Sequence, residues 1–284
     1  MSARYRIRHH SRYVYKESVA ASFNEARLTP LSLPWQVALE SDVDVDQASW
    51  LYRYVDYWGT QVRVFEVGTP HRDLVVNASS LVEVDAARRP VADEAMSWDA
   101  LHQQQSLDAY CEFLPQTHST EPPADLAALA EELAGSAATP RAAAHAINDA
   151  VYEAMTYEAG STGVATVAGE AWAARKGVCQ DYAHLVVGAL RHVGIPARYV
   201  SGYLHPGAQA ELGTPVVGES HAWVEWWLDE WTAHDPTNAA PVLDRHVMVG
   251  NGRDYADVPP IKGIVAGDPG ATELSVEVTI TQVA

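Results

Sequence analysis

The sequence predicts an α+β protein in which a β-rich N-terminal domain precedes a core of helices packed on an antiparallel sheet. Three observations support this fold class. Short runs that alternate apolar and polar residues fill residues 1–90, which is the pattern of half-buried strands. Between residues 124 and 194, apolar residues recur every three or four positions, as on the buried face of a helix. Two tryptophan-rich segments with strand periodicity then follow, at residues 219–228 and 231–235.

The first part, residues 1–90, is expected to form an accessory or substrate-shaping domain. Asp56-Tyr-Trp-Gly59 has the composition of a turn, and Thr69-Pro70 ends the strand Gln61–Val67 that follows this turn. Several strands at such short spacing are typical of a small sandwich or barrel. The expected strands are Tyr5–Tyr15, Phe23–Leu28, Gln36–Val45, Trp50–Tyr57, Gln61–Val67 and Leu74–Val84.

The rest of the chain divides into a connecting segment, residues 91–123, and a catalytic core, residues 124–284. The connecting segment is irregular and rich in glutamine and proline, and we expect it to carry one or two short helices. Its last residue, Pro123, precedes the first helix of the core. Thr272–Val283 alternates apolar and polar residues and is expected to be a half-exposed strand. The expected helices before the nucleophile are Ala124–Ala134, Pro140–Tyr157 and Thr166–Arg175.

Cys179 is the candidate nucleophile because it falls in the first turn of a predicted helix. From Tyr182 onward the apolar spacing is helical, while Gly194 and Pro196 end the pattern. The unpaired N–H groups and the positive dipole end of a helix start favour a thiolate. Taken alone, a cysteine in a helix is more often a small buried apolar residue. The function therefore depends on a matching base.

His221 and Asp235 are the candidate base and orienting acid. Residues 219–228 and 231–235 read as a hairpin joined at Asp229-Glu230, with Pro236 stopping the second strand. The start of one strand of a hairpin lies beside the end of the other, so we expect these two side chains to meet. His221 alone would be interpreted as a core histidine, and an aspartate before proline commonly forms a turn.

Three further residues are candidates for substrate binding or the oxyanion site. Gln180 follows the nucleophile, Tyr203 ends the strand after its helix, and Trp223 could line a groove on a strand whose tryptophans otherwise pack the sheet. The backbone N–H of Cys179 is the expected first oxyanion donor. No metal or cofactor is expected, because the sequence contains no CxxC pair and no HExxH motif.

Several of these segments resemble the transglutaminase-like superfamily, whose fold is a circular variant of the papain-like cysteine protease fold. The matching segments are GVCQDYAHL, GIPARYVSGYL, SHAWVEWW and HDPTN, and YRIRHHSRYVY with GRDYADVPPIKG resemble the flanks of bacterial transglutaminase-like proteins. The resemblance implies a papain-like core in which a helix-borne cysteine packs on an antiparallel sheet. It also implies Cys179 as nucleophile, His221 as base and Asp235 as orienting acid.

Composition narrows the possible partners. The formal net charge of −18, with no compensating basic stripe, argues against nucleic acid. No apolar run is long enough to span a membrane, and the basic N-terminus lacks the apolar stretch of a signal peptide; a cytoplasmic location is the default expectation. The two cysteines, Cys111 and Cys179, are not expected to pair. Cys111 is expected to be buried among its apolar neighbours.

The expected function is thiol-dependent acyl chemistry on an amide or peptide bond, through a thioester, with a peptide or protein as substrate. Resolution of the thioester by water would make the protein a cysteine peptidase or amidase, and we favour this outcome because no calcium loop or pro-segment restrains a cross-linking enzyme. Resolution by an amine would make it a protein-glutamine transglutaminase. A non-catalytic peptide-binding module with the same fold is the remaining alternative.

Overall fold

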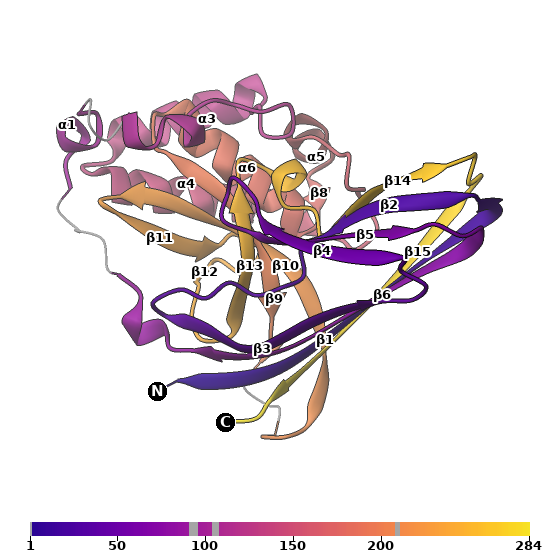
Figure 1. The fold of residues 1–284 in the computed structure, drawn as a ribbon. Coiled ribbons are helices and arrows are strands. Elements are labelled where there is room, and N and C mark those ends of the chain that lie inside the picture. Colours follow the sequence, from indigo (N-terminus) through magenta and orange to yellow (C-terminus); the bar gives the residue numbers. More distant parts are fainter. Residues whose placement is uncertain (1, 91–95, 104–107, 208–210) are drawn as a thin grey trace.

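The computed structural model describes residues 2–90, 96–103, 108–207 and 211–284, and it places helices against one end of a large branched sheet (Figure 1). The α-helices are α1 (Trp98–Leu101), α3 (Ala124–Ser136), α4 (Pro140–Ala154), α5 (Ala168–Ala174) and α6 (Cys179–His192). The strands of the first third are β1 (Ala3–Val19), β2 (Ala21–Ala26), β3 (Gln36–Val45), β4 (Trp50–Val55), β5 (Gln61–Val67) and β6 (His71–Val84). The later strands are β7 (Thr156–Tyr157), β8 (Lys176–Gly177), β9 (Ala197–Leu204), β10 (Pro215–Leu228), β11 (Glu230–Asp235), β12 (Ala240–Pro241), β13 (His246–Gly252), β14 (Ile261–Ala266) and β15 (Thr272–Gln282).

The helical layer forms because α3 and α4 each bury one apolar face against α6, which is itself buried along nearly its whole length. In α4, the Thr139 side chain caps the start and Pro140 occupies the first turn, where a missing N–H costs nothing. Its buried face includes Ile147 and Val151, which pack with α3, α6, β9 and β10 in one core. The helix ends at Ala154, earlier than the sequence predicted, because residues 156–157 pair with β8 instead. Among the described residues, no helix has both the length and the apolar character needed to cross a membrane.

The large sheet branches at β10. The first four residues of β10 pair with β15, while its later residues pair with β9 on one edge and β11 on the other. Beyond β15 the order continues through β1 and β6 to β3. A second sheet, in the order β14-β2-β5-β4, covers part of this surface, with Phe65 and Val76 in the shared core. The β-rich sandwich expected for the N-terminal part is therefore present.

The last two strands lie with the N-terminal strands. β15 pairs with β1 along eleven residue positions, from Tyr5 with Gln282 to Tyr15 with Thr272, and β14 pairs with β2. A third apolar cluster, which includes Ile7, Tyr203 and Ile280, joins β1 and β15 to β9 and β13. Residues 261–282, which the sequence analysis assigned to the catalytic core, thus tie that core to the β-rich part.

Short helical turns occur in the connecting segment, at α1 and at the 3₁₀ helix η2 (Cys111–Phe113). Residues 91–95 and 104–107 of this segment lie outside the described residues. The expected burial of Cys111 is wrong, because Cys111 is exposed. The apolar character of its surroundings comes from Phe113, which packs against Trp58 and Trp231.

Candidate active site

Cys179 is the first residue of α6 and is half-buried. The turn before it is held by Asp181, whose Oδ2 accepts hydrogen bonds from the Val178 backbone N–H at 2.8 Å and from the Thr162 hydroxyl at 2.6 Å. Gly177 is required here, because a Cβ at that position would come within 2.7 Å of the Asp181 side chain. Asp181 therefore satisfies a backbone N–H group at the start of the helix.

The hairpin of β10 and β11 brings His221 and Asp235 together. Asp229 joins the two strands and adopts the left-handed backbone conformation, with φ of 65°. Leu228, before it, pairs directly with Glu230, after it. His221 Nε2 lies 2.8 Å from Asp235 Oδ2, and the His221 and Cys179 side chains line the same pocket. The structure therefore brings the three sequence-predicted residues together.

Asp235 is fully buried and accepts hydrogen bonds on both oxygens. Oδ1 accepts the backbone N–H groups of Thr237 at 3.0 Å and Asn238 at 3.3 Å. Oδ2 is shared by His221 Nε2, by Asn238 Nδ2 at 2.7 Å and by His246 Nε2 at 3.2 Å. This set of donors fixes the carboxylate in one orientation and offsets the cost of burying its charge.

The electrostatics of the pair favour the charged form of both partners. Burial alone would lower the pKa of His221, but the hydrogen bond with Asp235 and the nearby Cys179 outweigh it and raise that pKa. Burial would likewise raise the pKa of Asp235, yet the hydrogen bonds from His221 and His246 hold it well below its usual range. His221 therefore carries a proton at neutral pH.

His246 is a second histidine on Asp235, and sequence reasoning missed it. It begins β13 and is buried. Its Nδ1 accepts the Leu243 backbone N–H at 3.3 Å, so Nε2 must carry the hydrogen that is donated to Asp235. Burial lowers the pKa of His246, which keeps the ring neutral. It lies eleven positions after Asp235, and no motif or spacing in the sequence points to it.

His221, Asp235 and His246 together offer ligand atoms within 4.8 Å of one another, which is a spacing that a metal ion could use. The hydrogen-bond pattern does not fit this role. A metal ligand needs a free lone pair on Nε2, whereas the Leu243 N–H occupies Nδ1 and assigns the hydrogen to Nε2 of His246. The cluster is therefore a hydrogen-bonded assembly.

A pocket of about 250 Å³ opens beside Cys179 and His221. Gln180 lines it and donates from Nε2 to the Val164 carbonyl at 3.2 Å. Tyr203 and Trp223, the other predicted substrate-binding residues, are buried in apolar clusters and are not among the residues that line the pocket. Tyr203 hydrogen-bonds to His9 instead. The far side of the pocket comes from β1, β14 and β15.

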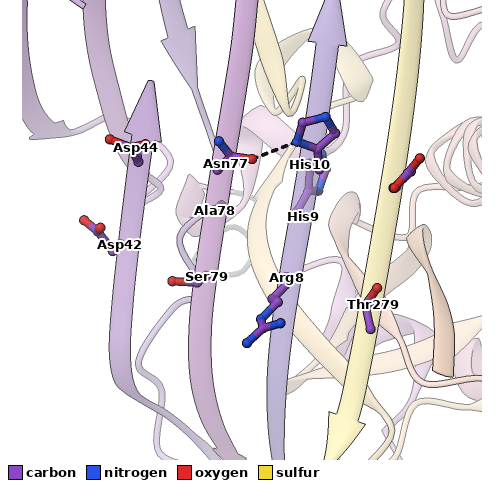
Figure 2. A pocket seen from close by; sticks show the side chains of 10 residues that line it. Arg8, His9, His10, Asp42, Asp44, Asn77, Ala78, Ser79 and Thr279 are labelled. Atoms are coloured by element: carbon purple, nitrogen blue, oxygen red, sulfur yellow. Dashed lines mark hydrogen bonds between the residues drawn. The ribbon is translucent and has the colours of Figure 1, made fainter. Parts of the chain in front are cut away.

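A larger hollow, of about 340 Å³, lies on the outer face of the β-rich sheet (Figure 2). Alternation along β1 directs the side chains of Arg8 and His10 to this face. His10 Nδ1 lies 2.7 Å from Asn77 Oδ1, and no cysteine lines the hollow. Its labelled polar residues are Arg8, His9 and His10 on β1, Asp42 and Asp44 on β3, Asn77 and Ser79 on β6, and Thr279 on β15. Cys179 and His221 line the smaller pocket and not this hollow.

Comparison with known proteins identifies the family. Residues 127–236 match the transglutaminase-like superfamily, and residues 5–83 match the bacterial transglutaminase-like N-terminal region. The uncharacterized protein ML0607 of Mycobacterium leprae is 42% identical over 99% of both chains. The chain belongs to the transglutaminase-like superfamily. The resemblance inferred from the sequence motifs is thereby confirmed.

Two further relatives of this transglutaminase-like protein carry more specific names. The protein-glutamine gamma-glutamyltransferase of Pseudomonas aeruginosa is 36% identical over 119 residues, which cover 39% of this chain and 18% of that protein. The crystal structure of a candidate cysteine protease from Cytophaga hutchinsonii superimposes with a TM-score of 0.78 at 20% identity, covering 100% of this chain and 92% of that one. This similarity shows a shared transglutaminase-like fold that combines β-rich sheets with helices.

Proposed function

We propose that this transglutaminase-like protein is a cysteine peptidase or amidase in which Cys179, His221 and Asp235 act as nucleophile, base and orienting acid. One observation carries the proposal: the His221 ring is hydrogen-bonded to Asp235 and shares a pocket with Cys179. This is the arrangement that thiol acyl transfer requires. The family assignment supports acyl chemistry on a thiol in general terms.

The mechanism follows from the protonation states of these groups. The Cys179 thiolate adds to the amide carbonyl carbon, and the carbonyl electron pair moves to oxygen. The backbone N–H groups of Cys179 and Gln180, in the first turn of α6, are the available donors for this oxyanion. His221 gives its proton to the leaving amine as the C–N bond breaks, which leaves a thioester and a neutral imidazole. Water then gives a proton to His221 while its oxygen bonds to the acyl carbon, and the acid and the thiolate are released.

Water is the acceptor that the pocket favours. A transglutaminase acting on protein lysines must bring a cationic amine to the thioester. Among the described residues, those lining the pocket include no aspartate or glutamate, so a lysine ammonium would lose its hydration without gaining a counter-charge. Water needs no such partner.

Amine transfer is the second candidate, because the Pseudomonas relative that matches over 119 residues is named a protein-glutamine gamma-glutamyltransferase. The two reactions share every step up to the thioester, so the residues named above serve both. A glutamine-containing peptide library with an excess of a primary amine separates them. Free acid or cleaved peptide supports hydrolysis. Amine incorporation that dominates at low amine concentration and disappears in Cys179→Ala makes transfer the better assignment.

The proposal is tested first at the thiol itself. Brief treatment with iodoacetamide at pH 7, followed by mass mapping, should label Cys179 faster than Cys111. The comparison is demanding because Cys111 is exposed and Cys179 is half-buried, so exposure alone predicts the opposite order. Preferential labelling of Cys111 would refute an activated Cys179 and favour the non-catalytic binding module. Cys179→Ala should remove turnover while leaving the thermal unfolding midpoint close to that of wild type.

A further inference from the structure

Four side chains on the far side of the Cys179 pocket form a surface that we call the apolar wall: Tyr13 on β1, Ile261 on β14, and Leu274 and Val276 on β15. Leu274 pairs directly with Tyr13. Alternation along β15 directs Leu274 and Val276 to the same face. These two side chains are 52% and 45% exposed. The wall is therefore uncovered apolar surface that faces the reactive thiol.

Apart from the reacting pair Cys179 and His221, the described residues of the pocket offer no charged side chain to a group that enters it. Among the described residues, its lining includes no aspartate, glutamate, lysine or arginine. His9 lines it too, but its ring nitrogens are occupied by the Ser11 hydroxyl at 2.8 Å and the Tyr203 hydroxyl at 3.1 Å. Burial lowers the pKa of His9 to about 4, so its ring is neutral at physiological pH. A charged substrate group would enter without a partner, which is costly.

The size of the pocket limits what the wall can hold. At about 250 Å³, it is smaller than the roughly 300–1,000 Å³ of pockets that enclose whole small-molecule ligands. It fits one side chain beside the carbonyl that Cys179 attacks. The rest of a peptide would have to lie outside.

We infer that the apolar wall is the specificity subsite of the protein, and that it takes one apolar side chain of a peptide acyl donor, adjacent to the carbonyl attacked by Cys179. This inference rests on the proposed function. It gives the β-rich part a role in catalysis: strand β1, together with β14 and β15, selects the substrate for residues carried by α6, β10 and β11.

The test uses three peptidyl chloromethyl ketones that differ only in the residue next to the ketone: leucine, lysine or aspartate. In each, the Cys179 thiolate displaces chloride and forms a thioether, so no turnover is needed. All proteins carry Cys111→Ser, which leaves one thiol, and intact mass gives the rate constant of modification. The leucine probe should react at least about tenfold faster than either charged probe, the discrimination that a hydrophobic pocket supplies.

The key variant is Val276→Glu, which should slow the leucine probe and accelerate the lysine probe. The matched control is Val217→Glu, because Val217 is an 82% exposed valine on β10 that pairs with Thr279 of β15 and does not line the pocket. This control should keep the wild-type order of probes. If Val276→Glu loses reactivity toward iodoacetamide, Leu274→Glu replaces it, since Leu274 is the more exposed of the two.

The outcomes separate this inference from the proposed function. Equal rates for the three probes in wild type, with iodoacetamide still labelling Cys179, would overturn the subsite and leave the reactive thiol in place. An unchanged probe order in both wall variants would also overturn it. Failure of iodoacetamide to label Cys179 would instead overturn the proposed function.

Discussion

Replacement of His246 by phenylalanine tests how the carboxylate of Asp235 is held. Phenylalanine keeps an aromatic ring against Trp223, whose ring centroid lies 5.4 Å away, and removes the donor to Asp235 Oδ2. A hydrogen bond to a charged group contributes about 1.5–3 kcal/mol. The separation of 3.2 Å is at the long end of the usual range, so we take about 1.5 kcal/mol, or roughly tenfold in rate. Asp235 keeps its other four donors, so a larger loss is not expected.

The assay needs no known substrate. Iodoacetate is anionic, so its reaction with Cys179 is fastest while His221 is protonated, and the rate falls as the imidazole loses its proton at alkaline pH. Without His246, the charge of Asp235 acts more strongly on His221 and raises the pKa of His221 further. The alkaline limb of the rate profile should therefore move to higher pH, while the maximal rate falls by no more than about tenfold.

The matched control is His205→Phe. His205 is buried, its Nδ1 accepts a backbone N–H from Gly207 at 3.4 Å, and its ring contacts Tyr5 rather than Asp235. It should leave the alkaline limb where it is in wild type. If His246→Phe and His205→Phe give the same profile, His246 contributes packing alone and our reasoning is wrong. A loss of about ten-thousandfold, as expected when a triad member is removed, would show that His246 is indispensable to Asp235.

Three further outcomes are expected. Gly188→Ala should lower the free energy of unfolding in urea by about 1–3 kcal/mol, because its Cβ would lie 1.8 Å from the Thr120 carbonyl oxygen. The control Gly135→Ala, whose Cβ would have nothing within 4 Å, should raise that free energy by about 0.5–1 kcal/mol. Equal effects of the two variants would contradict the steric explanation. The lowered pKa of Asp235 stabilises the folded state above about pH 3.9, and this stabilisation is lost on acidification. The raised pKa of His221 stabilises the folded state below about pH 6.5, and this stabilisation is lost as the pH rises. The stability difference between wild type and His221→Gln should therefore be larger at pH 6 than at pH 9. EDTA should leave the rate at which iodoacetate modifies Cys179 unchanged. A decrease in that rate that added zinc reverses would show that the cluster of His221, Asp235 and His246 binds metal.

The sequence predicted those features that depend on neighbouring residues. Gln36–Val45 and Gln61–Val67 form strands with the expected bounds, because alternation along a strand is local. The meeting of His221 with Asp235 was predictable for the same reason, since a short turn brings together the ends of the hairpin.

Long-range pairing and single-residue orientation could not be predicted in this way. The half-exposed strand at residues 272–282 was recognised, but its pairing with β1 depends on which distant edge is available. His246 reaches Asp235 because β13 pairs with β9 and folds back toward β11, which no periodicity encodes. Cys111 was misassigned because apolar neighbours do not determine which residue of a short 3₁₀ turn faces outward.

The pairing of β1 with β15 also sets the order in which the site can mature during synthesis. The ribosome makes Cys179, His221 and Asp235 before residues 272–282, so the nucleophile and its base can meet in a nascent chain that still lacks part of the apolar wall. The contact between Ile7 and Ile280 closes a loop of more than 270 residues, and such non-local contacts form slowly. A chain caught before that step would expose Cys179 without the complete apolar wall opposite it. Correct docking of the last strand therefore completes the lining of the pocket around Cys179.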